Sequence, residues 1–198
     1  MTNDALTGQV IAAIGGGDAH HRAVAVAAAE AGASVALATF NTLSEQEFSV
    51  NSVANEIWAI GRDHFADVIE ASDPEQMGAF AQKAWSQLGP CDAIVVVSSL
   101  PTPSPDSPVE EKRAFAGRHR TPLLAAQAFG QLMREHGGGA VVFVAPERDP
   151  ADEKALNAAL SAHLGAGGPR ITVVGRDAPA PEKAAARLLA LLSPEPAS

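Results

Sequence analysis

Short apolar runs alternate along the chain with longer segments whose apolar or small residues recur at helical spacing. The runs predict strands over residues 9–14, 34–38, 64–70, 93–97, 140–144 and 171–174. The longer segments predict helices over 19–31, 44–60, 72–88, 110–136, 152–164 and 181–192, and Pro122 is expected to bend the fourth of them. Because strands and helices alternate throughout, we expect a parallel sheet with helices on both faces, joined by right-handed crossovers.

Helix boundaries carry their own signals. Gly32 and Gly61 follow the first two helices at the position where a left-handed residue often ends a helix. Ser72, with Glu75 three residues on and Pro74 in the first turn, predicts the start of the third helix. In the second helix, the apolar positions expected to face the core are Phe48, Val53, Ile57 and Ile60.

Composition and charge narrow the classes of protein. The chain has 198 residues, 46% of them hydrophobic and 19% charged, which favours one soluble domain over residues 1–198 with a frayed tail from about residue 193. The formal net charge is −9 and the basic residues are scattered, so we expect no nucleic-acid-binding surface. We see no signal peptide and no membrane-spanning stretch, and the one cysteine, Cys91, fits a buried thiol in a reducing cytoplasm.

The first forty residues contain a strand, a glycine-rich turn, a helix and a second strand. The turn and the start of the helix read Ile14-Gly15-Gly16-Gly17-Asp18-Ala19-His20-His21. This layout resembles the opening of the short-chain dehydrogenase/reductase (SDR) family. The resemblance implies an α/β fold: a three-layer, doubly wound, Rossmann-like parallel sheet of about six strands in the order 3-2-1-4-5-6. No seventh strand is expected, so the family's sheet is truncated at the C-terminus.

The glycine motif of the family, Thr-Gly-x-x-x-Gly-x-Gly, is only partly present. Its first glycine is Gly15, while Ala19 and His21 stand at the second and third glycine positions. Asp18 lies where a helix N-cap carboxylate can take the amide donors that would otherwise bind a phosphate. The turn, Gly17 included, is therefore either a modified nucleotide pocket or a glycine turn kept for the fold, and we favour the second interpretation.

The remaining cofactor positions of the family depart from its pattern as well. Phe40 and Asn41 follow the second strand, where the family carries an acid or basic residues that select NAD or NADP. Glu70 matches an Asp near the adenine, and Ser98 could offer a hydroxyl at the mouth of the crevice. The candidate cofactor-binding residues are thus Gly15, Gly17, Asp18, His21, Phe40, Asn41, Glu70 and Ser98. We expect no cofactor, or weakly bound NAD or NADP.

The catalytic residues implied by the family are missing. Its reaction uses a Tyr, a Lys four residues later and a nearby Ser, whereas this chain has no tyrosine and no hydroxyl at 144–148, where the Ser would fall. Glu147, Asp149 and Asp152 could act as an acid or base or bind a cation, although a hydrated acidic loop is the favoured interpretation. Adjacent His20 and His21 point apart on a helix, and no metal-binding motif is present. We therefore assign no catalytic or metal-ligating residue.

These observations leave two classes of function. One is an inactive SDR-like protein that binds a small-molecule ligand or acts in assembly. The other is an NAD(P)-dependent oxidoreductase with an atypical active site, and the missing hydroxyl donors favour the first. The resemblance also implies a homo-oligomer built on residues 110–136 and 152–164, and small residues at Ala155, Ala158, Ala159 and Ala162 suit close helix packing.

Overall fold

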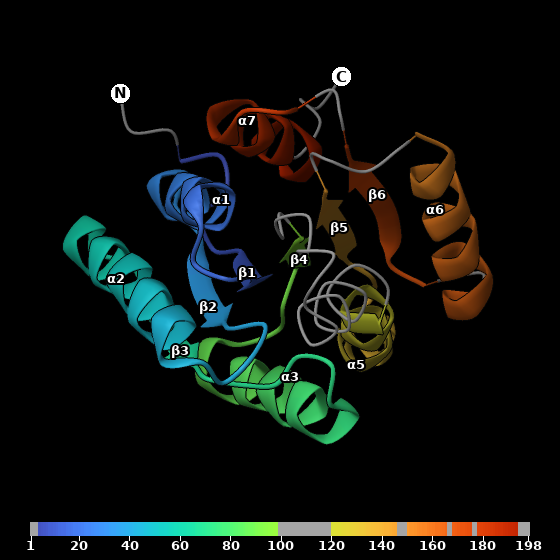
Figure 1. The fold of residues 1–198 in the computed structure, drawn as a ribbon, viewed down its shortest axis with the longest axis horizontal. Coiled ribbons are helices and arrows are strands. Elements are labelled where there is room, and N and C mark those ends of the chain that lie inside the picture. Colours follow the sequence, from blue (N-terminus) through green and yellow to red (C-terminus); the bar gives the residue numbers. More distant parts are fainter. Residues whose placement is uncertain (1–3, 99–119, 146–149, 166–167, 176–177, 194–198) are drawn as a thin grey trace, which may run out of the picture.

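A computed structural model describes residues 4–98, 120–145, 150–165, 168–175 and 178–193 (Figure 1). The strands are β1 (Val10–Ile14), β2 (Ser34–Ala38), β3 (His64–Asp67), β4 (Ala93–Val97), β5 (Ala140–Val144) and β6 (Arg170–Val174). They form one sheet in the order β3-β2-β1-β4-β5-β6, and every neighbouring pair is parallel. The predicted fold class and strand order are confirmed.

The helices are α1 (Ala19–Glu30), α2 (Ser44–Ile60), α3 (Pro74–Leu88), α5 (Thr121–Glu135), α6 (Pro150–Leu164) and α7 (Pro181–Leu192). Gly32 and Gly61 have positive φ angles, 104° and 83°, at the ends of α1 and α2, as predicted. The start of α3 differs from the prediction by one residue. Asp73, not Ser72, caps this helix, because its carboxylate accepts from the amides of Glu75 and Gln76.

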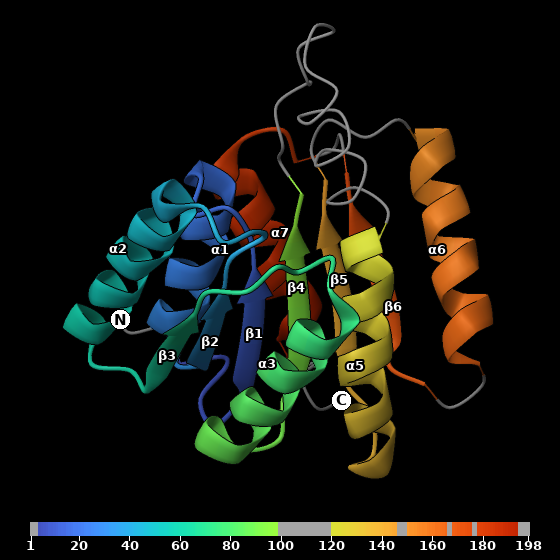
Figure 2. The same cartoon turned by 60° about the horizontal axis from the view of Figure 1, so that its bottom comes forward.

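Two hydrophobic layers hold the helices on the sheet. In Figure 2 the helices lie on both faces of the strands, with α1, α2 and α7 on one face and α3, α5 and α6 on the other. Alternate residues of each strand enter opposite layers: Ile11 and Ala13 of β1 pack toward α1, while Ala12 and Ile14 pack on the other side. The strands are apolar on both faces for this reason, as is usual in parallel sheets.

The position of Phe48 contradicts the sequence-based prediction. Val50, Val53 and Ile57 of α2 are buried against the sheet, whereas the Phe48 side chain is 79% exposed. Phe48 is separated from the buried stripe by about half a helical turn, because each residue advances the helix by about 100°. The prediction was wrong because Phe48 was assigned to the core from its aromatic side chain. Val50 is the residue that completes the buried apolar repeat.

Helix α5 is described from Thr121, so the predicted helical stretch 110–119 lies outside the described residues. Pro122 falls in the first turn of α5, where a missing N–H costs no intrahelical bond, rather than at a bend. Strand β3 ends at Asp67, three residues earlier than predicted. Within the described part of the chain, no helix is both long and apolar enough to span a membrane.

A pair of phenylalanine substitutions tests the core and the exposed face together. Phe80 of α3 is fully buried and lies edge-on to Phe129 of α5, with ring centroids 5.8 Å apart. Phe80→Ala should lower the free energy of unfolding by about 3–5 kcal/mol. Phe48→Ala should change it by less than about 0.5 kcal/mol. Urea unfolding of both variants at low protein concentration measures the difference, and similar losses would contradict the assigned burial.

Candidate functional site

The candidate site lies at the carboxyl ends of the central strands. The chain crosses from β1 to β2 on one side and later returns to β4 on the other, so the order of the strands reverses between β1 and β4. A crevice outside the sheet at such a switch point is where doubly wound folds bind ligands. The glycine turn Gly15–Gly17 leaves β1 at this point and leads into α1.

The side chain of His21 fills the space beneath the glycine turn. The ring is fully buried, its Nδ1 accepts from the Gly17 amide at 3.1 Å, and its Nε2 lies 3.3 Å from the Ala13 carbonyl oxygen. A Cβ atom at Gly15 would stand 2.5 Å from His21 Cγ, so the ring fits only because Gly15 has no side chain. The histidine thus bonds the turn to β1 from within.

The two hydrogen bonds define the protonation state of His21. Nδ1 accepts a hydrogen bond and therefore carries no proton, while Nε2 carries the proton and donates it to Ala13. Burial lowers the pKa of His21 from 6.5 to about 4, and the nearby Asp18 carboxylate and the Ala13 carbonyl only partly oppose that shift. The ring is neutral at physiological pH.

Asp18 occupies the amide donors at the start of α1. Its Oδ1 accepts from the amides of His20 at 2.8 Å and His21 at 3.1 Å, which confirms the predicted N-cap. A helix N-terminus with free amides attracts a pyrophosphate, but here a fixed carboxylate already uses two of them. Ala19 follows as an exposed residue in the first turn, and His20 Nε2 lies 3.2 Å from the Pro179 carbonyl oxygen.

Gln46 occupies the next part of the crevice, and sequence reasoning missed it. Its Oε1 accepts from the amides of Phe40 at 3.0 Å and Asn41 at 3.1 Å. Its Nε2 would lie 3.3 Å from a Cβ atom at Gly16, so the side chain reaches from the end of β2 to the glycine turn. No pattern singled it out, because a glutamine in the first turn of a helix usually faces water.

The first half of α2 also closes on the glycine turn. Gly17 has a φ of 76°, and a Cβ atom there would stand 2.4 Å from Ser49 Cβ. Gly17 is therefore required both for the left-handed backbone and for the close approach of α2. Gln46 and Ser49 thus both lie against the glycine turn, and Gln46 also bonds the end of β2.

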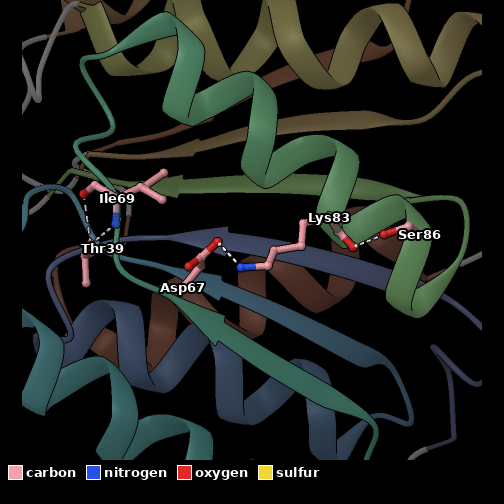
Figure 3. Close-up of polar contacts among 5 residues, drawn as sticks. All are labelled: Thr39, Asp67, Ile69, Lys83 and Ser86. Carbon is pink, nitrogen blue, oxygen red and sulfur yellow. Dashed lines mark hydrogen bonds and ion pairs between the residues drawn. The ribbon is translucent and has the colours of Figure 1, made fainter.

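The end of β2 is tied to the segment after β3. Figure 3 shows the hydroxyl of Thr39, which donates to the Ile69 carbonyl at 3.0 Å and accepts from the Ile69 amide at 2.9 Å. Phe40, only 6% exposed, packs into the core instead of presenting a face on which an adenine could stack. On the neighbouring helix, Lys83 forms an ion pair with Asp67 at 2.9 Å (Figure 3).

The acidic candidate Glu70 has internal partners. Its carboxylate accepts from the Ser72 hydroxyl at 2.7 Å, and its amide donates to Gln76 Oε1 at 2.8 Å. The Ser98 amide donates to the Val144 carbonyl at 2.8 Å, which fixes the end of β4 beside β5. Both residues follow strands at the carboxyl edge of the sheet.

Several predicted features cannot be placed. Glu147 and Asp149 lie outside the described residues, as do most of the positions where the family carries its Ser, Tyr and Lys. Among the residues that the structure describes, no cluster of three or more His, Cys, Asp or Glu side chains could hold a metal ion. Cys91 is buried, as predicted, and burial raises the pKa of its thiol to about 12.

A groove lies away from the glycine turn, at the β6 edge of the sheet. It is an open groove of about 420 Å³ between the first half of α6 and β6. Its lining residues are Glu153, Lys154, Asn157, Ile171, Thr172 and Val173. The groove is formed without the glycine turn and contains none of the predicted site residues.

Comparison with solved structures identifies the fold. The structure resembles a short-chain type dehydrogenase/reductase from Mycobacterium marinum, with a TM-score of 0.78 and 22% identity over 96% of this chain and 90% of that one. It also resembles a hydroxysteroid dehydrogenase from Escherichia coli, with a TM-score of 0.76 and 22% identity over 98% and 93% of the two chains. A metagenomic short-chain oxidoreductase in complex with NADP gives a TM-score of 0.77 and 21% identity over 96% and 93%.

The protein thus has the fold of short-chain dehydrogenases/reductases across nearly its whole length. At these identities the likeness shows the fold alone. No protein-family model matches the sequence, and no curated protein matches it either.

The buried neutral His21 predicts a specific loss of stability in acid. Because its pKa is lower in the folded state than in the unfolded chain, the contribution is fully present above about pH 6.5 and is lost as the pH falls toward about 4. The loss should reach about 3 kcal/mol of unfolding free energy. Urea titrations across this range should show it, and His21→Gln should remove most of the slope.

His64→Gln is the matched control, since His64 is a half-buried histidine remote from the turn. It should keep the acid-dependent loss of the unmodified protein. An unchanged slope in His21→Gln would contradict the assignment of the buried neutral ring.

Proposed function

We propose that this protein is a divergent member of the SDR family that catalyses no dehydrogenase reaction and acts as an assembly protein. One observation carries the proposal: the protein's own side chains already bond the backbone amides that line the cofactor crevice. Asp18 bonds two of these amides, His21 bonds the Gly17 amide, and Gln46 bonds two more at the end of β2. A dinucleotide would have to replace these bonds and would gain little in exchange.

The electrostatics of the crevice support the same conclusion. A pyrophosphate at the start of α1 would meet the carboxylate of Asp18, which caps the helix at that point. The neutral form of His21 offers no positive charge in compensation. Like-charge contact in a partly buried site is costly, so the crevice disfavours the phosphates on which NAD and NADP recognition depends.

The chemistry of the family's reaction supports inactivity as well. Reduction of a carbonyl needs a group that protonates the oxygen as hydride arrives, and the family uses a tyrosine for it. The chain has no tyrosine, so no phenol can supply that proton. The alternative function, an oxidoreductase with an atypical site, requires both a cofactor and another proton donor in this crevice.

Calorimetric titration with NAD(H) and NADP(H) tests the proposal. The Kd of the unmodified protein for either cofactor should lie above about 1 mM. This corresponds to a binding free energy smaller than about 4 kcal/mol in magnitude. A variant carrying Asp18→Ser, Ala19→Gly and His21→Gly should gain affinity, because it removes the carboxylate, frees the Gly17 amide and restores the glycines of the motif.

Asp73→Ser is the control, since it changes the N-cap aspartate of α3 and leaves α1 unchanged. It should leave dinucleotide affinity as it was. Low micromolar binding by the unmodified protein, or turnover near 1 per second or above on a panel of alcohols and ketones, would contradict the proposed function.

Assembly is proposed to use the helices over residues 110–136 and 152–164. Ala155, Ala158, Ala159 and Ala162 form an exposed small-residue face on α6, and Leu123, Leu124 and Leu132 of α5 are only partly buried. A second copy could cover these faces by close helix packing. Ala159→Glu should therefore dissociate this contact without unfolding the domain, because an unpaired charge would be buried.

Light scattering at micromolar concentration measures the mass, which should exceed the 20.3 kDa of one chain. Ala79→Glu, at an exposed alanine of α3, is the control and should keep the mass of the unmodified protein. A monomeric mass for the unmodified protein would rule out this contact.

A further inference from the structure

The exposed large apolar side chains belong to elements at the β3 end of the sheet. In the described part of the chain these are Leu43, Phe48, Trp58 and Val68, with exposed fractions of 42%, 79%, 73% and 37%. All four belong to α2, its N-cap or the segment that follows β3. Helix α2 is the outermost element at this end, and no other described element covers its outer face (Figure 2). Aromatic residues are enriched in interfaces, and two of them are exposed on this one helix.

The exposed residues of α2 include a regular seam. Starting from Ser44, steps of four, three, four and three residues lead to Phe48, Asn51, Asn55 and Trp58. All five are exposed and none is charged, although the chain as a whole carries a net charge of −9. Alternating steps of three and four are the spacing by which one helix packs along another. We call these five residues the α2 seam.

We infer that the α2 seam binds the α2 seam of a second copy, with the two helices antiparallel. The spacing of its last four residues, Phe48 to Trp58, reads the same in both directions about the midpoint between Asn51 and Asn55, and Ser44 lies outside this symmetric part. An antiparallel pair centred there places Phe48 against Trp58 of the other copy at both ends, and Asn51 against its Asn55 in the middle. The same residues meet twice, as a two-fold axis requires.

The chemistry of these contacts suits the antiparallel arrangement. Aromatic rings in contact are stabilised beyond the area that they bury, and each asparagine amide offers both a donor and an acceptor to its counterpart. A polar asparagine within such a seam favours one register over its neighbours. Glu47, beside the seam, meets the uncharged Ala59 of the other copy in this register.

A parallel pair would be disfavoured. It would bring Glu45 and Glu47 of the two copies together in the first helical turn, and it would align the two helix dipoles. The antiparallel pair separates these acids and opposes the dipoles. The residual repulsion between two acidic proteins is screened by salt, so association should strengthen as ionic strength rises.

This contact is independent of the one proposed for α5 and α6. Helix α2 lies at the β3 end of the sheet, whereas α6 lies at the β6 end, and Figure 1 shows them on opposite sides of the molecule. A chain that used both contacts would form assemblies larger than a dimer. Each contact can therefore be removed separately.

Sedimentation at several concentrations tests the inference with Trp58→Glu, made in the unmodified protein and also in Ala159→Glu. In Ala159→Glu the α2 contact should still produce dimers. Adding Trp58→Glu should raise the dissociation constant of these dimers at least about 30-fold, which is the effect of losing an interface hot spot. Gln82→Glu, at an exposed position of α3, is the control and should leave the Kd unchanged. Circular dichroism confirms that each variant is folded.

The fluorescence of Trp58 provides a second readout. The chain has two tryptophans, so Trp85→Phe leaves Trp58 as the sole reporter. Iodide quenching should fall as the protein concentration rises, because association covers the exposed indole. The inference would be overturned if the quenching constant stayed the same at all concentrations and the mass of Trp58→Glu equalled that of the unmodified protein. The α2 seam would then not bind a second copy.

The register is tested with cysteines. Asn51→Cys and Asn55→Cys chains, mixed in equal amounts and mildly oxidised, should form more of the mixed disulfide than random pairing of the two chains gives, while the native Cys91 is buried and does not compete. A mixed product no more abundant than random pairing gives would overturn the antiparallel register.

Discussion

The position of one buried imidazole ring determines the shape of the glycine turn. His21 lies beneath the turn, accepts from the Gly17 amide and donates to the Ala13 carbonyl, so it connects the end of β1 to the start of α1. The ring can take this position because Gly15 has no side chain to collide with it. Where a dinucleotide-binding turn leaves its amides open to a ligand, this one closes on a residue of its own chain.

The consequences extend across the crevice. With the turn held from beneath by His21, Asp18 caps α1 from above, and Gln46 bonds the end of β2 while lying against the turn. In the described part of the chain, no buried side-chain nitrogen or oxygen lacks a hydrogen-bond partner. Polar groups that are satisfied within the protein have little free energy to gain from a ligand, which is the basis of the proposed weak recognition of phosphate.

Most of the fold could be predicted from the sequence, because hydrophobic periodicity and helix-ending glycines are local signals. The strand order followed from the resemblance, and the N-cap role of Asp18 followed from its position before α1. Gln46 and the burial of His21 could not be predicted, because both depend on contacts between segments that meet only in the folded chain. Phe48 shows the converse error: an aromatic residue was assigned to the core, although the register of α2 turns it outward.

The most direct test of this account observes the His21 ring itself. Nitrogen NMR of the imidazole is recorded at about pH 5.5. This pH lies between the ordinary pKa of 6.5 and the lowered pKa of about 4. We expect a neutral ring with the proton on Nε2 and an unprotonated Nδ1, with no change of either signal when NADP is added. A doubly protonated ring at that pH, or signals that shift on adding NADP, would contradict the claim that the protein fills its own cofactor crevice.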